Sequence, residues 1–426
     1  MDTLDHLPPL PLFIDYSDET GLGFMGLKTP TVSSEDELGI YHALRLHDRV
    51  RRIELRVSPP TLDKYLRVMD EPFPILEHLS LSMPITSVFS DSYTRDSVTP
   101  LTPFNVFLAP NLRHLSLQNI HLPKRLRLLS STLSLVTLKL TNIQASGYIH
   151  PRLLVARLES LLQLEELSIE FLIPIPRPSA EMLLLGKQGT PVILSNLKFL
   201  TFRGVSAYLE RLISQIRAPV LRILNVGLFN QLAFTLTHLS QFVNNTEQIK
   251  FPRTATIKFI FGGSIILGPC ERFTRRGYEG FTLYVMCRPL DWQVDCAAQI
   301  CSALMSTLSG IESLTLQNIN RLAPSDLGTY ETDHTIYDIT WLELLRSFVG
   351  VKELHMNHYF SVELSRALEV EEIGLDPGLL PDLQELVGES RGQHADGLFG
   401  SFIHARQVAG RPVSLRLTPP PLPIRA

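Results

Sequence analysis

Cysteine is scarce in this chain of 426 residues, and its four copies all lie between positions 270 and 301. Four thiols in one segment are too few to staple a chain of this length, which excludes a disulfide-held scaffold. We therefore expect free, buried thiols and an intracellular protein, cytoplasmic or nuclear. None of the four has the close pairing of a zinc finger or ribbon, so no metal is expected.

An excess of charge of one sign is also lacking. Lys and Arg number 39 and Asp and Glu number 43, which gives a net charge of -4. Such a chain has no overall positive field to attract phosphate backbones or anionic lipid. The basic cluster between Arg45 and Arg56 is interleaved with His47, Asp48 and Glu54, which favours a mixed solvated surface over a nucleic-acid patch. We expect no nucleic-acid partner.

Long apolar runs are missing too. The most apolar run, residues 257–268, is interrupted by Lys258 and by glycines. It is shorter than the roughly 20 apolar residues that a membrane-spanning helix needs. Residues 1–9 are acidic and contain prolines, where a secretory signal would have a basic end followed by an apolar stretch. We expect neither export nor a membrane partner.

Motifs of catalysis and cofactor binding are absent as well. No serine lies in a Gly-x-Ser-x-Gly turn, and no Gly-Lys-Ser or Gly-Lys-Thr ending marks a phosphate loop. His355 and His358 lie near the end of an expected strand, where alternation would turn them to opposite faces. We predict no enzyme activity, no cofactor and no metal site, and an enzyme is only the third alternative.

What the chain does contain is a recurring phrase, Leu-x-x-Leu-x-Leu. Its copies, some with Ile, Val, Phe or Met replacing a leucine, begin at Val50, Leu76, Leu112, Leu135, Leu164, Leu197, Leu221, Ile311, Val351 and, more weakly, Leu383. Between positions 112 and 221 the spacing varies from 23 to 33 residues, around the roughly 20 to 29 residues usual for leucine-rich repeats. Some copies continue as Leu-Gln-Asn-Ile (117–120 and 316–319), with Asn eighth where the common pattern has it ninth. The repeats are therefore irregular, and asparagine ladders are not assumed.

The phrase predicts how each repeat folds. Because side chains alternate along a strand, the fourth and sixth positions point inward together. Residues 153–162, 209–216 and 300–308 have helical spacing between the phrases. Stacked strand and helix units bury a continuous core, and a strand, a helical crossover and a parallel strand turn right-handedly. We predict an α/β fold, an irregular leucine-rich-repeat solenoid or horseshoe, with parallel strands on the concave face and helices on the convex face.

This fold implies three segments. Residues 1–40 are predicted to be an N-terminal extension and loop, residues 41–416 the solenoid, and residues 417–426 a proline-rich tail. Within the solenoid, residues 252–308 are a less regular insertion where the phrase vanishes. Residues 256–261 and 281–286 are predicted to be strands that continue the sheet.

Four stretches of the chain resemble the repeat region of fungal F-box proteins, whose leucine-rich repeats follow an amino-terminal F-box. They are residues 9–16, 47–55, 72–81 and 402–407. The resemblance implies the substrate-recognition region of a ubiquitin ligase receptor. Beyond Leu7-Pro8, nothing near the start resembles the helical F-box, so the ligase adaptor subunit is implied as a partner only if a missing F-box exists upstream. The alternative is a free-standing repeat scaffold or adaptor with no ligase link.

The third, fifth and seventh positions of each phrase point away from the expected core. Stacked strands would align them on the concave surface, where small polar and singly charged side chains suit a protein interface. Each polar residue also has a simpler interpretation as part of a solvated strand face. Phe199 is either an aromatic anchor or packs against a loop. The predicted partner-binding residues are Arg52, Glu54, Arg56, His78, His114, Gln118, Lys139, Glu166, Glu170, Phe199, Arg203, Gln317, Glu353 and His355.

Overall fold

The computed structural model describes residues 10–17, 34–84, 107–120, 127–174, 190–250, 253–260, 264–268, 273–274, 277–287, 290–318, 334–368, 379–389 and 398–418. These residues form a mixed α/β protein with a large, mostly parallel sheet of 15 strands. The α/β class predicted from the sequence is confirmed. The chain divides into unit 1, Met1–Gly204 with Gln215–Leu221, and unit 2, Val205–Ser214 with Arg222–Ala426. Leu7-Pro8, Cys270 and residues 419–426 lie outside the described residues.

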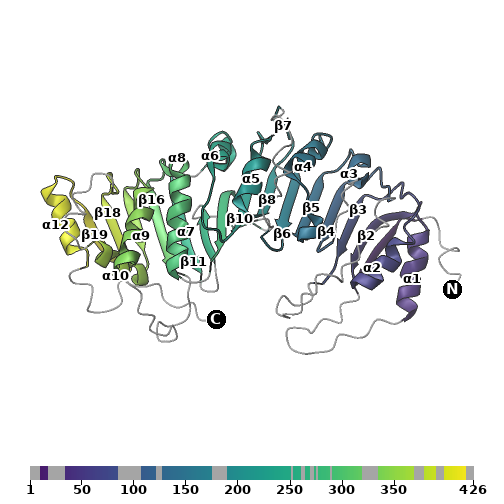
Figure 1. Ribbon diagram of the computed structural model, residues 1–426, viewed down its shortest axis with the longest axis horizontal. Helices are drawn as coiled ribbons and strands as arrows, with labels where there is room; N and C mark the ends of the chain where they lie inside the picture. Colours follow the sequence, from purple (N-terminus) through teal and green to yellow (C-terminus); the bar gives the residue numbers. More distant parts are fainter. Residues whose placement is uncertain are drawn as a thin grey trace. The chain divides into compact units, whose positions relative to one another are not determined.

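Unit 1 has seven strands of this sheet, all parallel and in chain order (Figure 1). They are β1 (Leu12–Ser17), β2 (Val50–Arg56), β3 (His78–Ser82), β4 (His114–Gln118), β5 (Thr137–Ile143), β6 (Glu166–Phe171) and β8 (Phe199–Gly204). The short strands β7 (Val192–Ile193) and β9 (Ile216–Arg217) pair separately. Residues 1–40 were predicted to be an extension and loop, but β1 pairs with β2, so the sheet begins before residue 41.

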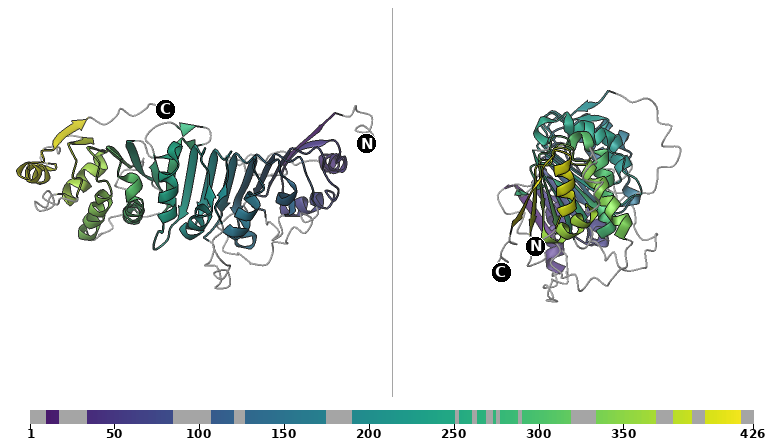
Figure 2. Two further views of the ribbon diagram at one scale, coloured as in Figure 1. Left: turned by 90° about the horizontal axis from the view of Figure 1, so that it is seen from above. Right: turned by 90° about the vertical axis from the view of Figure 1, so that its left-hand side faces the viewer.

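The helices of unit 1 lie along one side of its strands (Figure 2). They are α1 (Ser34–Arg45), α2 (Pro59–Leu66), α3 (Arg127–Ser131), the 3-10 helix η2 (Ala145–Gly147) and α4 (Pro151–Leu158). In α4 a proline fits the first turn, where its missing N–H has no partner to lose, and Leu154 and Leu158 are buried. The helical spacing predicted to residue 162 ends at Leu158, and Leu162 is exposed.

The core of unit 1 is a ladder of fourth-position leucines. Strand register aligns Leu79 with Leu115, Leu115 with Leu138, and then Leu167 and Leu200 in turn. All five are at most 1% exposed. Burying a leucine contributes about 1.5 to 3 kcal/mol, so the inward positions predicted from the phrase are the main source of stability in this unit.

The Asn of the extended phrase has a conformational role in unit 1. Asn119 and Asn142 have φ values of 58° and 55°, in the left-handed region. Asn tolerates this region better than other residues with a Cβ. The turn directs the ninth residue inward, so that Ile120 and Ile143 are 5% and 4% exposed. The eighth-position Asn therefore has a left-handed conformation, after β4 at Asn119 and within β5 at Asn142, directly before an apolar side chain that lies in the core.

Unit 2 has eight strands of the sheet, in the order β10-β15-β12-β11-β16-β17-β18-β19. Their bounds are β10 (Ile223–Phe229), β11 (Thr254–Ile260), β12 (Ser264–Gly268), β15 (Gly280–Met286), β16 (Ser313–Asn318), β17 (Glu353–Met356), β18 (Glu385–Glu389) and β19 (Ser414–Thr418). Both strands predicted in the less regular insertion exist, as β11 and β15. β12 was not predicted from the sequence, and it is antiparallel to both of its neighbours. The short strands β13 (Phe273–Thr274) and β14 (Gly277–Tyr278) pair with each other.

The helices of unit 2 are α5 (Ser206–Ile213), α6 (Thr237–Asn244), the 3-10 helix η4 (Glu247–Ile249), α7 (Leu290–Ala303), α8 (Met305–Leu308), α9 (His334–Arg346), α10 (His358–Ala367) and α12 (Gly400–Val408). The helical spacing predicted to residue 216 ends at Ile213, because Ile216 joins β9. Phe259 of β11 packs against Trp341 and Phe360, with ring centroids 5.7 and 5.1 Å away. This cluster lies beside a second ladder, in which Leu314, Leu354 and Leu386 align. No helix of the described residues is long and apolar enough to cross a membrane.

Candidate partner-binding surface

The predicted binding residues of unit 1 lie on the face of the sheet that the helices leave open. Burial alternates along β3 and β4, where Leu79, Leu81, Leu115 and Leu117 are buried and the residues between them are half-buried. Arg52 and Arg56 are exposed. The other predicted residues of this unit are half-buried, namely Glu54, His78, His114, Gln118, Lys139, Glu166, Glu170, Phe199 and Arg203. Register therefore brings all eleven together on one surface, which we call the unit 1 open face.

Ion pairs and hydrogen bonds connect neighbouring residues of the unit 1 open face. Lys139 Nζ lies 2.8 Å from Glu166 Oε1 on the adjacent strand, and Arg52 pairs with Glu54 at 2.7 Å along one strand. Ser168 donates a hydrogen bond of 2.9 Å to Glu170. The hydrogen bond from Arg52 is the main cause that lowers the pKa of Glu54. Much of the charge on this face is therefore compensated locally.

His78 and His114 lie side by side on adjacent strands of the open face. Their ring centroids are 5.7 Å apart, and His114 Nδ1 lies 3.1 Å from Thr137 Oγ1. Burial lowers the pKa of both imidazoles, and the cations of Arg52 and Arg113 lower it further for His78 and His114 respectively. Both rings are therefore held toward the neutral form, in which each is a donor and an acceptor of hydrogen bonds.

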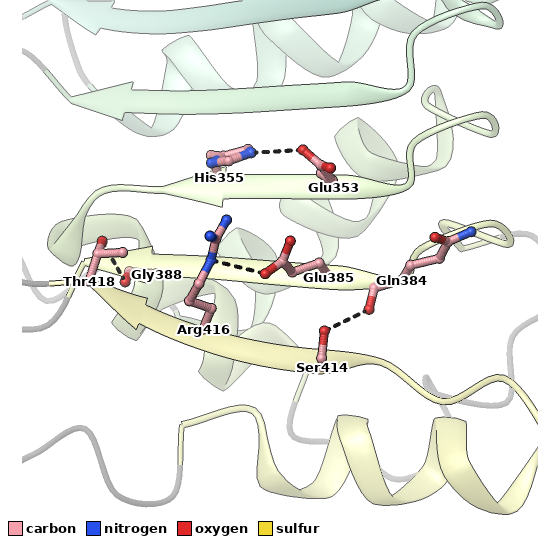
Figure 3. A network of polar contacts seen from close by, with 8 residues as sticks. All are labelled: Glu353, His355, Gln384, Glu385, Gly388, Ser414, Arg416 and Thr418. Atoms are coloured by element: carbon pink, nitrogen blue, oxygen red, sulfur yellow. Dashed lines mark hydrogen bonds and ion pairs between the residues drawn. The ribbon is translucent and has the colours of Figure 1, made fainter.

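Unit 2 places its predicted residues on two adjacent strands. Gln317 is half-buried on β16, and Glu353 and His355 lie on β17, with His355 Nε2 3.3 Å from Glu353 Oε2 (Figure 3). On the next strands, Arg416 Nε lies 3.0 Å from Glu385 Oε1 (Figure 3). The sequence analysis missed this last pair because β19 lacks the first leucine of the phrase. The alternation of Leu415 and Leu417 was the signal that marked the strand.

A second row of residues, also missed, runs along the amino ends of the strands. It consists of the second positions of the phrase, directly after the first leucine. The N–H groups of Arg113 and His114 both donate to the Glu77 carbonyl, and those of Val136 and Thr137 both donate to the Arg113 carbonyl. This shared backbone step sets the second-position side chains next to one another. We call these residues the second-position ladder.

The charged residues of the second-position ladder of unit 1 alternate in sign, with the uncharged Val136 between Arg113 and Glu165. Arg51 donates to both carboxylate oxygens of Glu77, at 2.9 and 3.1 Å, and Lys198 lies 2.9 Å from Glu165. In unit 2, Glu312 lies 3.3 Å from Arg253 and 3.4 Å from Lys352. The alternating sign of the residue after each first leucine was the available signal. Such exposed pairs each contribute only about 0 to 1 kcal/mol.

The described cysteines do not form a binding centre. Cys287, Cys296 and Cys301 are buried and free, as the sequence analysis predicted. A hydrogen bond with Cys296 and burial raise the pKa of the Cys287 thiol, and burial raises that of Cys301. Among the residues that the structure describes, no group of three or more His, Cys, Asp or Glu is placed to hold a metal ion.

Comparison with known proteins adds no family to this picture. No protein-family model matches the chain, and no curated protein matches it. The class that the fold and the surface define is a mixed α/β protein with a mostly parallel sheet, one face of which carries a polar, hydrogen-bonding surface in unit 1.

Proposed function

We propose that this chain is a protein-binding module built from irregular leucine-rich repeats, a solenoid with its strands on the concave face. The partner would lie on the unit 1 open face. Parallel strands in chain order, a helix or turn between phrases and leucines in register support the repeat interpretation. The proposed class of function is recognition, with no enzyme activity and no cofactor.

One observation carries this proposal, namely that register joins the polar residues of six neighbouring strands, β2 to β8, into a continuous surface. At about 4.8 Å between strands, this surface is roughly 24 Å across. It presents charged, amide, hydroxyl and imidazole groups with one half-buried aromatic, Phe199. Protein interfaces have this mixture, whereas small-molecule sites are concave and mostly apolar.

The resemblance to fungal F-box proteins suggests which recognition role is involved. In that case the partner would be a substrate of a ubiquitin ligase, and an adaptor-binding F-box would lie upstream of this chain. The alternative is a free-standing scaffold with no ligase link. Co-purification of the full-length native gene product with the ligase adaptor subunit would support the first role, and its failure would support the second.

Site-specific photo-crosslinking tests the proposed surface. A photoreactive amino acid at Ser116, on the open face, is expected to capture a discrete partner from an extract of the source cells. The same group at Leu153, which is 59% exposed on α4, is the matched control on the helix side. The captured protein is then purified and its affinity is measured directly.

Charge reversals complete this test. The triple variant Arg52→Glu, Glu166→Lys, Arg203→Glu is expected to weaken binding of the purified partner by about tenfold or more. Each reversed charge would face a partner group of the same sign, and such like-charge contacts across an interface are costly. Arg157→Glu, an exposed reversal on α4, is the control. Equal capture from Ser116 and Leu153, or unchanged affinity of the triple variant, would contradict the proposal.

A further inference from the structure

A groove lies at the amino ends of β3 to β6, next to the residues of the open face. Its volume is about 490 Å³, and it is lined by Ile75, Asn111, Arg113, Ser134, Val136 and Gln163, with Glu77 at one end. Each of these residues immediately precedes or follows the first leucine of a phrase. The groove is therefore a product of the repeat, formed by equivalent positions of four successive copies.

The groove coincides with a break in the second-position ladder. Along unit 1 the second positions are Arg51, Glu77, Arg113, Val136 and Glu165. The uncharged Val136 separates Arg113 from the next acidic second position, Glu165, so Arg113 has no carboxylate at the neighbouring second position on the β5 side. Glu77 is already bound by Arg51. Among the described residues, the exposed guanidinium of Arg113 therefore makes no ion pair.

The lining of the groove combines one cation with apolar and amide groups. Ile75 is 37% exposed, and Val136 also lines the groove and is half-buried. Asn111 uses its amide nitrogen to donate 2.6 Å to the Pro74 carbonyl, which fixes the side chain. A guanidinium is a planar fork that matches a carboxylate, and the pair is stronger than a neutral hydrogen bond. The groove therefore offers a carboxylate a charged contact with apolar side chains at its flanks.

We infer that this groove binds a short, extended acidic segment of a protein partner, whose carboxylate pairs with Arg113 beside the uncharged Val136. Four strands about 4.8 Å apart span roughly 14 Å, which matches four or five extended residues. A phosphodiester chain fits poorly, because Glu77 stands at the end of the groove and the site has a single unpaired cation. This inference goes beyond the proposed function, because the residues that line the groove are not those of the open face.

Fluorescence anisotropy with two peptides tests the inference on the full chain at low ionic strength. The probes are fluorescein-labelled Gly-Leu-Glu-Leu-Gly and its Gln counterpart, both with amidated carboxyl ends so that the Glu side chain is the only peptide carboxylate. The Glu peptide is expected to bind about tenfold more tightly than the Gln peptide, since the charge-assisted pair is lost in the latter. Raising the salt concentration is expected to reduce this difference.

Two variants and one matched control locate the binding. Arg113→Gln removes the guanidinium, and Val136→Glu places a carboxylate of the chain itself beside Arg113, so each is expected to abolish the preference for the Glu peptide. Lys198→Gln removes another second-position cation, one that is paired with Glu165 outside the groove, and is expected to retain the preference. Circular dichroism melts confirm that each variant is folded, and Arg113→Gln decides the test if Val136→Glu is not.

The outcomes separate this inference from the proposed function. The triple variant of the open face is expected to bind the Glu peptide as the natural chain does. Equal binding of both peptides, no binding of the Glu peptide at millimolar protein, or an unchanged preference in Arg113→Gln would each overturn the inference. None of these results would affect partner capture through Ser116.

Discussion

Unit 1 and unit 2 use the same repeat step with different strand orders. In unit 1, the N–H groups of Val136 and Thr137 donate to the Arg113 carbonyl of the preceding phrase. In unit 2, those of Glu312 and Ser313 donate to the Arg253 carbonyl in the same way, although α7, β12 and β15 lie between them in the chain. The comparison shows that two strands pair through the same local register even when a long segment separates them in the sequence.

The open faces of the two units also differ in chemistry. That of unit 1 is rich in charged and imidazole groups. In unit 2, Tyr284 lies against Gly227 of β10, where an added Cβ would come within 2.1 Å of the tyrosine Cζ. The glycine therefore makes room for the ring. Met286, which pairs with Phe229 in the register, is 41% exposed. At this part of unit 2, the open face therefore has the larger side chains of Tyr284 and Met286 where unit 1 has charged and imidazole groups.

The largest expected effect concerns the aromatic cluster that packs the reordered strand β11 of unit 2. Phe259→Ala removes the ring that contacts Trp341 and Phe360, and is expected to lower the free energy of unfolding by about 3 to 5 kcal/mol. Urea unfolding measures the loss, and hydrogen exchange is expected to show it first in β11 and β16. The exposed Leu153→Ala in unit 1 is the control, with a change within about 0.5 kcal/mol. A loss under about 1 kcal/mol for Phe259→Ala would deny the cluster this role.

An intermediate effect is expected at the left-handed Asn near the carboxyl end of β5 in unit 1. Asn142→Ala forces a residue with a less suitable side chain into a φ of 55°, and is expected to cost about 1 to 2 kcal/mol. Asn142→Gly is expected to be close to neutral, because glycine adopts this φ freely. Thermal melts of the two variants check the order. If alanine and glycine were equally tolerated, the conformational explanation of the eighth-position Asn would fail.

The smallest expected effect is a pH dependence specific to unit 1. The pKa values of His78 and His114 are lowered from 6.5 in the folded chain, so the unfolded chain binds protons more readily. The stability that these lowered pKa values contribute is present above pH 6.5, and it is lost as the pH falls through the pKa values of the folded chain. For His78, the cation of Arg52 disfavours protonation and the carboxylate of Glu54 favours it. For His114, the cations of Arg113 and Lys139 disfavour protonation, and the carboxylates of Glu77 and Glu166 favour it.

Melting temperatures between pH 8 and pH 5 measure this effect. The natural chain is expected to lose more stability on acidification than the double variant His78→Gln, His114→Gln. The pH profile of a single variant in unit 2, His355→Gln, is measured for comparison with that of the double variant. His355 lies beside Glu353, on a different part of the sheet. Parallel pH profiles for the natural chain and the double variant would show that the histidine pair has no such role.

The sequence predicted which side chains share a strand face in unit 1 better than in unit 2 for a physical reason. Where the phrase is intact, as at Leu112 and Leu135, alternation alone assigns each side chain to the core or the open face. In the insertion no phrase marks the register, so β12 was missed although β11 and β15 were predicted. Arg416 was missed because its strand is marked by two leucines only. The second-position ladder was present in the sequence but needed the backbone step to become visible as a surface.

By itself, the sequence determined the α/β class, most of the strands and which leucines are buried, because these follow from a local period that each phrase carries. Only the tertiary structure decided the order β10-β15-β12-β11-β16, the neighbours His78 and His114, and the groove beside Arg113. These features depend on which strands lie next to one another. Pairing across tens of residues is set by the packing of the whole unit, so no short stretch of sequence encodes it.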